Sequence, residues 1–323
     1  MDFHLEFSPK QFSTTIQHLD KLLLIGSCFT ENIGAKLRQH KFRVVENPNG
    51  ILFNPISIAS AVNSYISARK FMETDLFFQN ECWNSWEHHS RFSNPDKEKC
   101  LQGINSSLQL ANEFISKAGW VFISVGSAFV YELDDGRVVA NCHKVPNDKF
   151  NKRLLSIAEV VTAFKQMLDN LFAVNPLLKI IFTISPVRHI RDGFVENNRS
   201  KSTLIQAVHH LTATGENIFY FPAYELVIDD LRDYRFYAED MVHPNYAATN
   251  YVWEKFVVTG IDESTQKLMK EINIINAARS HRPFHPTSEQ HKRFLQMNLQ
   301  KVKLLHQQFP YLDFEEEIAY FGS

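Results

Sequence analysis

Short apolar runs alternate with helix-compatible stretches along most of this 323-residue chain. Five runs are predicted to form strands, because they are rich in apolar residues and end at glycine, proline or polar residues. These runs are Leu22 to Ile25, Phe42 to Glu46, Trp120 to Gly126, Lys179 to Ser185 and Asn217 to Phe221. Helices are predicted over Thr30 to His40, Pro55 to Lys70, Pro95 to Ala118, Ser156 to Val174, Asn198 to Thr214 and Tyr246 to Val257.

Strands that alternate with helices predict an α/β domain whose open, mostly parallel sheet is covered on both faces. We expect this domain to span residues 1–260, with a hairpin in which Val130 to Glu132 pairs with Val138 to Ala140. Residues 261–323 are expected to form a C-terminal helical extension. Its two helical stretches, 263–282 and 286–308, could act as a lid or a dimerisation element.

Composition excludes several classes of protein. A formal net charge of -2 gives no bulk attraction to nucleic acid or to anionic lipid. The longest apolar runs fall short of the roughly 18 residues of a membrane span, and the N-terminus has no signal-peptide pattern. The four cysteines form no C-x-x-C pair, so we expect no zinc site and free thiols in a cytoplasmic protein.

Candidate chemistry lies where the predicted strands end. In an open parallel sheet, ligands bind beyond the carboxyl ends of the strands. Ser27 and Cys28 follow the first strand directly, and a helix follows them. Far downstream, Asp240 precedes His243 by three residues. A thiol or hydroxyl, an imidazole and a carboxylate together are the nucleophile, base and orienting group of an acyl-transfer site.

Several segments resemble the GSCFA family, a bacterial group that looks related to the SGNH (GDSL-type) hydrolases. The resemblance covers residues 20–257. Its segments are Gly26-Ser27-Cys28-Phe29, Asn47-Pro48-Asn49-Gly50, Asn141-Cys142-His143-Lys144, Ser185-Pro186-Val187-Arg188-His189, Arg232-Asp233-Tyr234-Arg235-Phe236-Tyr237 and Asp240-Met241-Val242-His243-Pro244. It implies a three-layer α/β/α fold with a flavodoxin-like sheet, and leaves the substrate open.

The resemblance also bears on the nucleophile. GDSL-type enzymes carry Gly-Asp-Ser at this strand end, and in that register Cys28 falls at the catalytic serine while Ser27 falls at the aspartate. Cys28 is therefore the first candidate, and Ser27 is the alternative, with a helix cap as its structural role. A following helix N-terminus and a nearby imidazolium lead us to expect a lowered thiol pKa. In the register of the superfamily's Gly-x-Asn-Asp block, the segment beginning at Gly126 lacks the asparagine, which Asn141 or Asn54 could replace.

The base is expected to be His243, because an imidazole can take a proton from a thiol or hydroxyl near neutral pH. Asp240 would then orient the ring; the alternative is a loop-capping acid beside an exposed histidine. Gly50 is a candidate backbone donor to an oxyanion or a plain turn residue, and Gly126 is a further candidate.

Three more polar residues are expected to bind substrate, each with a structural alternative. Asn141 and His143 either line the pocket or follow the hairpin. Arg188, with His189, could bind an anionic group of the substrate. The adjacent His88 and His89 do not indicate a metal site, because neighbouring side chains diverge and no spaced third ligand is present.

Two functions remain open on these residues. The first is an esterase or acyltransferase that needs no cofactor and acts on an esterified small molecule or saccharide through a Cys/Ser-His-Asp site. The second is a non-catalytic module of the same fold that binds a glycan or a protein. A Cys28 that reacts like a free cysteine would favour the second. The oligomeric state has no signature in the sequence.

Overall fold

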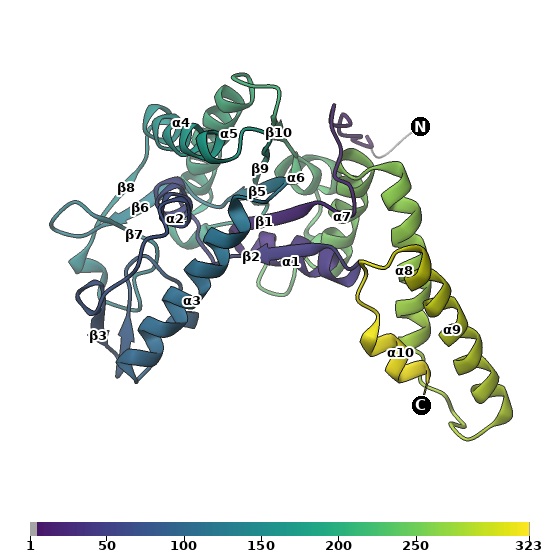
Figure 1. The fold of residues 1–323 in the computed structure, drawn as a ribbon. Coiled ribbons are helices and arrows are strands. Elements are labelled where there is room, and N and C mark those ends of the chain that lie inside the picture. The colour runs from purple at the N-terminus through teal and green to yellow at the C-terminus, as the bar shows by residue number, and fades with distance from the viewer. Residues whose placement is uncertain (1–4, 323) are drawn as a thin grey trace.

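A five-stranded parallel sheet lies at the centre of the protein, whose computed structural model describes residues 5–322 (Figure 1). The strands run in the order β10-β9-β5-β1-β2. Their bounds are β1 (Lys21–Gly26), β2 (Arg43–Glu46), β5 (Trp120–Val125), β9 (Lys179–Ile184) and β10 (Ile218–Tyr220). This is the flavodoxin-like order, in which the first two strands of the chain are exchanged at one edge. All five strands lie where the sequence predicts them.

Helices cover both faces of this sheet, and successive residues of each strand point to opposite faces. The helices are α1 (Cys28–Gln39), α2 (Pro55–Ile66), α3 (Lys97–Ile115), α4 (Ile157–Val174), α5 (Phe194–Thr212) and α7 (Tyr246–Gly260). In β1, Leu23 and Ile25 pack in one core with α2, α3, α4 and α5, whereas Leu22 and Leu24 pack in another with α1 and α7. The prediction of a three-layer α/β/α fold is confirmed.

Several smaller elements lie outside the central sheet. A two-stranded sheet joins β3 (Phe77–Gln79) to β4 (Cys82–Asn84). The predicted hairpin of β6 (Phe129–Glu132) and β7 (Val138–Val139) is present, and β8 (Asn151–Leu154) adds a third strand that the sequence pattern missed. After β10, the short helix α6 (Ala223–Glu225) leads into a π-helical stretch.

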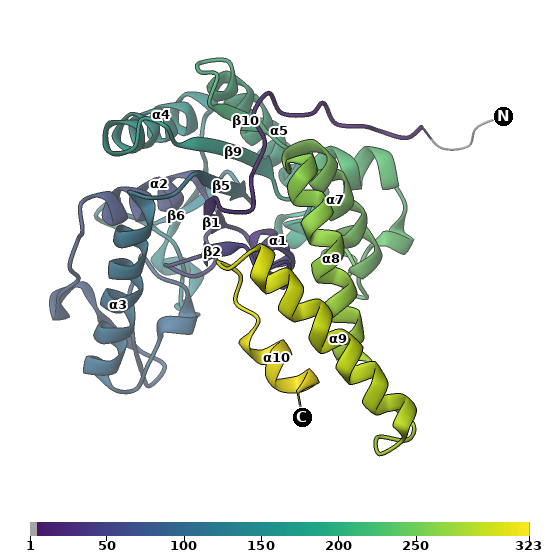
Figure 2. The same cartoon turned by 45° about the vertical axis from the view of Figure 1, so that its right-hand side comes forward.

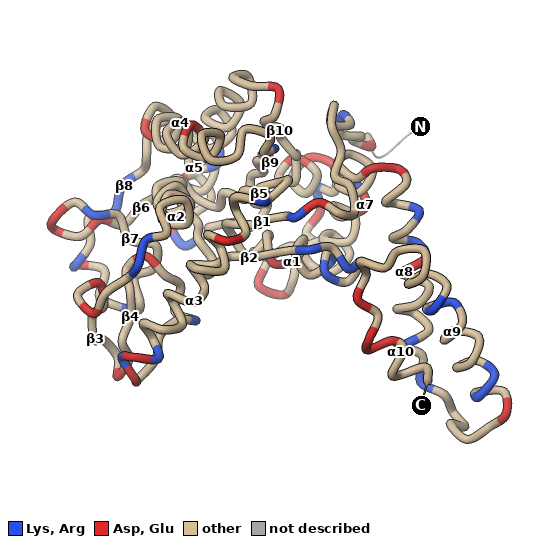
Figure 3. The backbone as a smooth tube through the Cα atoms, viewed as in Figure 1, with Lys and Arg blue, Asp and Glu red and all other residues tan. Residues whose placement is uncertain are grey.

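The C-terminal helices α8 (Glu263–Ser280), α9 (Glu289–Gln308) and α10 (Glu315–Phe321) extend away from the α/β body in both views (Figures 1 and 2). They enclose a small apolar core of their own. Three glutamates begin α10, where negative charge is favoured, and Figure 3 marks them in red. One of them, Glu317, binds Lys41 at 3.0 Å and so ties the extension to the body. Within residues 5–322, no helix has the length and apolarity needed to cross a membrane.

The junction between β1 and α1 is tighter than the sequence pattern indicates, because α1 begins at Cys28 and not at Thr30. Gly26 makes this junction possible. Its φ is +137°, and a Cβ at this position would lie 2.0 Å from the carbonyl oxygen of Ser124 on β5. Only glycine allows the two backbones to approach so closely, and the chain then turns directly into the helix that carries the thiol.

We expect Gly26→Ala to lower the free energy of unfolding by about 3 kcal/mol or more, because it combines backbone strain with a clash against main chain. Gly136→Ala is the matched control. Gly136 also has a positive φ, of +81°, but open space surrounds it, so only the conformational cost of about 1–2 kcal/mol applies. Urea denaturation of both variants measures the difference. Equal losses would show that the contact with Ser124 is unimportant.

Candidate active site

Cys28 is the first residue of α1 and follows the carboxyl end of β1 by two positions. The residue is partly exposed. Burial raises the pKa of this thiol, and the nearby Glu31 carboxylate adds to the effect. The N–H groups of Cys28 and Phe29 and the charge of Lys201 act in the opposite direction. The expectation of a lowered thiol pKa is therefore wrong, because the cost of desolvation outweighs the helix terminus.

Ser27 points elsewhere. Its side chain is fully buried, and its hydroxyl lies 2.8 Å from the hydroxyl of Ser124 in the middle of the sheet. Its N–H donates to the carbonyl oxygen of Ser124 at 3.0 Å. Although Ser27 precedes the helix, its side chain makes no capping hydrogen bond. The hydroxyl thus links β1 to β5, whereas the adjacent thiol stays partly open to solvent.

The Asp240 and His243 side chains form a pair at the surface, each with 49% of its side chain exposed. One carboxylate oxygen lies 2.6 Å from His243 Nδ1, and the other accepts the backbone N–H groups of Val242 and His243. The backbone N–H of His243, then its ring, then the N–H of Val242 lower the pKa of Asp240 to about 2. Since a carboxylate can only accept, Nδ1 is the donor, and Nε2 is the nitrogen that is free to take a proton.

A backbone hydrogen bond holds this loop at the carboxyl edge of the sheet. The N–H of Arg188, in the segment that follows β9, donates to the carbonyl oxygen of Val242 at 3.2 Å. The Arg188 guanidinium lies over two rings, 4.2 Å from the centroid of Tyr237 and 5.0 Å from that of Tyr234. These contacts fix the loop. Because Arg188 Nη1 is buried without a hydrogen-bond partner, the role of Arg188 as an anion ligand stays a prediction.

Two further titratable groups, His189 after β9 and Lys201 on α5, are largely withdrawn from solvent. His189 Nε2 is buried without a hydrogen-bond partner, and burial lowers the pKa of this ring to about 3, with smaller effects from the charges of Lys201 and His243. Lys201 donates to the carbonyl oxygens of Gly126 and Ser185, both at 2.7 Å. Electrostatic interactions therefore connect Cys28 to Lys201, Lys201 to His189, and His189 to His243.

Neither glycine that the sequence suggested as an oxyanion donor has a free N–H. Gly50 donates to the carbonyl oxygen of Asn47 at 2.7 Å, with φ at +81°, and is a turn residue packed on His89. Gly126 donates to the carbonyl oxygen of Phe53 at 2.9 Å. Its lack of a side chain serves a different purpose, since a Cβ there would lie 3.2 Å from His189 Nε2.

The three polar side chains near the hairpin and α2 are also committed to local hydrogen bonds. The side chain of Asn141 accepts the N–H of His143 at 2.8 Å, and His143 Nε2 contacts the carbonyl oxygen of Ser85 at 2.9 Å. Asn54 caps α2 by accepting the N–H of Ser57 and donating to its hydroxyl. These bonds agree with the alternative in which Asn141 and His143 follow the hairpin, and their role in lining a pocket stays a prediction.

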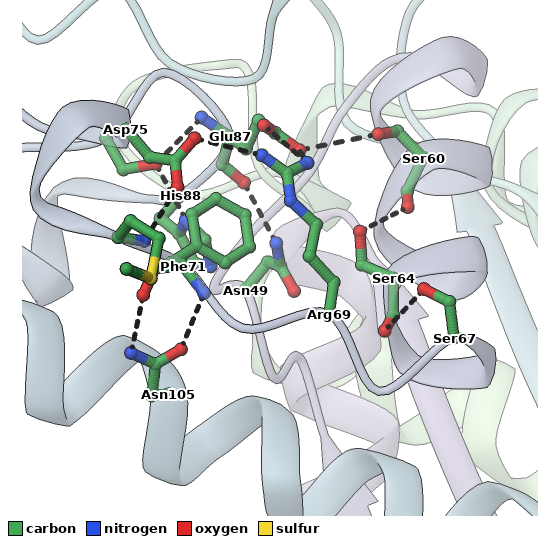
Figure 4. A network of polar contacts seen from close by, with 12 residues as sticks. Asn49, Ser60, Ser64, Ser67, Arg69, Phe71, Asp75, Glu87, His88 and Asn105 are labelled. Carbon is green, nitrogen blue, oxygen red and sulfur yellow. Dashed lines mark hydrogen bonds and ion pairs between the residues drawn. The ribbon is translucent and has the colours of Figure 1, made fainter.

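A separate polar cluster surrounds Arg69 (Figure 4). Its guanidinium binds Glu87 at 2.9 Å and Asp75 at 3.2 Å, and these side chains line a cavity of about 380 Å³ beside α2. Neither Cys28 nor His243 lines this cavity. In the part of the chain that the structure describes, no group of three or more His, Cys, Asp or Glu side chains could hold a metal ion.

Comparison with known proteins identifies the family. The profile of the GSCFA family matches residues 21–256, which is most of the chain. The protein belongs to the GSCFA family. A second profile, the C-terminal domain of GSCFA domain proteins, matches residues 272–323 and so corresponds to the helical extension.

Two solved structures are similar to this GSCFA protein. A carbohydrate esterase family 3 protein from Talaromyces cellulolyticus has 11% sequence identity and a TM-score of 0.38, with 79% of this chain and 99% of that chain covered. An acetyl esterase mutant with acetate ion has 11% identity and a TM-score of 0.36, with 80% and 100% covered. The comparison with curated proteins found no match.

Lys201 was not predicted from the sequence as a site residue, and His189 was predicted only as an anion ligand. The signal for Lys201 was present, because it falls within the buried stripe of α5 that also holds Asn197, Leu204 and Val208. A lysine is almost never fully buried unless its ammonium group is paired with other polar groups. No comparable signal marks His189, since the ring that it contacts, Phe53, lies more than 130 residues earlier in the chain.

Proposed function

We propose that this GSCFA protein is an acyl-transfer enzyme, an ester hydrolase or acyltransferase, in which Cys28 is the nucleophile. The observation that carries the proposal is the 2.6 Å pair of Asp240 and His243. We infer that this pair faces the thiol, because its loop is bonded to the segment after β9, and Cys28 follows β1 of the same parallel sheet. The backbone bond from Arg188 to Val242 supports this placement. The burial of the Ser27 hydroxyl against β5 favours Cys28 over Ser27.

In the proposed reaction, the sulfur of Cys28 attacks the ester carbonyl carbon while its proton passes to His243 Nε2. Asp240 holds Nδ1 and stabilises the imidazolium that forms. The C–O bond of the ester then breaks, and the leaving alcohol takes the proton from His243. Water, or a second hydroxyl group, next attacks the thioester, gives its proton to His243, and releases the acyl group with regeneration of the thiol.

The oxyanion would be stabilised at the first turn of α1. The asparagine of related hydrolases is absent, and Gly50, Gly126 and Asn54 donate to other groups. The N–H groups of Cys28 and Phe29 belong to the first turn of α1, and both lower the pKa of the thiol. A carbonyl oxygen on the acylated sulfur would therefore lie near the positive end of the helix dipole. We propose an ester of an alcohol or saccharide as the substrate.

The alternative is a non-catalytic module that binds a glycan or a protein. It is favoured by one observation, the raised pKa of the Cys28 thiol, because a thiol that is mostly protonated at neutral pH is a poor nucleophile. The alternative predicts that Cys28 reacts no faster than Cys82, the partly exposed cysteine of β4.

A trapping experiment distinguishes the two functions. The protein is mixed with p-nitrophenyl acetate, quenched in acid and digested for mass spectrometry. We expect one acetyl group on the peptide that contains Cys28, and its release by neutral hydroxylamine, which cleaves thioesters much faster than serine esters. An acetyl group that resists hydroxylamine would assign the nucleophile to Ser27. The absence of both acetylation and turnover, with Cys28 and Cys82 equally reactive toward iodoacetamide, would support the binding module.

A further inference from the structure

The cavity of about 380 Å³ beside α2 takes no part in the proposed acyl-transfer site. Four segments that lie far apart in the chain form its walls: the first two turns of α2, residues 69–75, residues 85–87 after β4, and residues 137–140 around β7. Its volume falls within the range of about 300–1,000 Å³ that is typical of small-molecule sites. The tertiary structure thus builds a hollow of ligand size that the proposed mechanism leaves without a function.

One wall of the cavity is polar, and its side chains are already held in place (Figure 4). The Arg69 guanidinium lies between Glu87 at 2.9 Å and Asp75 at 3.2 Å, and 4.1 Å from the centroid of the Phe71 ring. The Ser60 hydroxyl lies 3.5 Å from Glu87. Between 29% and 37% of each of the three charged side chains stays exposed. A ligand that contacts them therefore pays little for ordering them.

The rest of the lining is apolar. It includes Trp86, Ile56, Val138 and Ala140. The Trp86 ring stacks on Phe77, with 3.7 Å between centroids and 14° between planes. The backbone carbonyl of Trp86 accepts the N–H of Ala140 at 2.7 Å, so the aromatic residue is fixed to the hairpin. A ligand that fills this cavity has to present C–H groups to one wall and hydrogen-bonding groups to the other.

The charges around the cavity limit the class of ligand. Two acids, Asp75 and Glu87, line it together with two arginines, Arg69 and Arg137. Arg137 also binds the exposed Asp135 at 2.7 Å. An anionic group placed here would face two carboxylates, and like charges at short distance disfavour binding. Hydroxyl groups suit this wall, because each can donate to a carboxylate and accept from a guanidinium.

The cavity adjoins two further hollows. One of about 560 Å³ lies between α2 and α4 and shares Ile56 and Ser60 with it, two residues that lie on one face of α2. The other, of about 400 Å³, shares Trp86 and Arg137. A ligand longer than one ring therefore has room beyond both of the shared walls.

We propose that this cavity is a binding site for a short, neutral oligosaccharide, separate from the Cys28 site. A sugar ring carries C–H groups on its faces and hydroxyls at its edge. The faces pack against the apolar wall around Trp86, and the hydroxyls bind Asp75, Glu87 and Arg69. The site goes beyond the proposed function and does not rest on it, since saccharide binding here needs neither the thiol nor His243.

The test is an NMR titration that follows the indole N–H of Trp86, which is assigned by its absence in Trp86→Phe. The probes are the neutral disaccharides cellobiose, maltose, xylobiose and N,N′-diacetylchitobiose. We expect a saturable shift with at least one of them. Ser60→Leu places a larger side chain in the cavity from an exposed position on α2, and should weaken that binding about tenfold or more.

Ser106→Leu is the matched control, because Ser106 is an exposed serine on α3 that does not line the cavity. It should bind the same probe with wild-type affinity. Circular dichroism checks that both leucine variants are folded. No saturable shift with any of the four disaccharides would overturn the proposal. Binding that Ser60→Leu retains would also overturn it, because the sugar would then occupy another place.

A second pair of variants tests the polar wall. Asp75→Asn keeps an acceptor for the N–H of Met72 but removes the negative charge, and should weaken binding about fivefold. Glu73→Gln is its control: Glu73 is also the acid of an ion pair, with Lys97, but does not line the cavity. Equal affinities of the two variants would contradict the assignment of Asp75.

A charged sugar tests the ligand class. Glucuronic acid adds a carboxylate to the ring and should give no saturable shift at Trp86. Its binding in preference to the neutral probes would overturn the neutral class.

The outcome is distinguishable from that of the proposed function. Saccharide binding at Trp86 in a protein whose Cys28 is never acetylated would leave this site standing and remove the enzyme. Acetylation of Cys28 with no saccharide binding would do the reverse.

Discussion

Cys28→Ala is expected to lower kcat/KM for short-chain p-nitrophenyl esters by on the order of 10³-fold or more, because the reaction then loses its covalent intermediate. The substitution removes only a partly exposed sulfur at the start of α1, so we expect the fold and the melting temperature to be retained. The measurement is initial-rate kinetics at fixed pH, with circular dichroism to confirm that the variant is folded.

Cys82→Ser is the matched control, because Cys82 is also partly exposed but lies in the β3–β4 hairpin. It should retain wild-type activity. Ser27→Ala gives a second comparison. It removes the hydrogen bond to Ser124, so we expect a loss of about 1 kcal/mol in stability with most of the activity kept. An active Cys28→Ala protein together with an inactive, folded Ser27→Ala protein would show that the nucleophile is Ser27 and not Cys28.

His243→Ala is expected to lower kcat by roughly 10²–10⁴-fold and to remove the dependence of kcat/KM on the ionisation of a histidine. The ring is half-exposed and pairs only with Asp240 among the contacts described, so its loss should change stability little. Asp240→Asn tests the same pair by changing the carboxylate in place of the imidazole. Because the pKa of Asp240 is about 2, the native group is a carboxylate throughout the working range, and the amide cannot stabilise an imidazolium.

The control for this series is His210→Ala, which replaces an exposed histidine on α5. It should leave both the rate and the pH profile unchanged. Steady-state rates between pH 5 and pH 9 test the series. Activity that survives His243→Ala with the wild-type pH profile would contradict the mechanism, because His243 would then not be the base.

The elements of the fold follow from local patterns and were predictable for that reason. Each central strand is an apolar run, and side chains of each run meet a helix face on both sides of the sheet. The strand β8 was not predicted, because Asn151–Leu154 is polar and short and pairs with β6 outside the central sheet. The division of the chain at residue 260 stays a prediction, since Met269 of α8 still packs in the core of the main domain.

The sequence by itself determined the alternation of strands and helices, the thiol at the end of the first strand and the Asp240–His243 pair, because each depends on residues close together in the chain. Only the tertiary structure decided that Ser27 bonds to Ser124, that Gly50 and Gly126 have no free N–H, and that Lys201 donates to the carbonyl oxygens of Gly126 and Ser185. The physical reason is that the direction of a side chain and the partners of a backbone group depend on atoms supplied by other strands, often a hundred residues away.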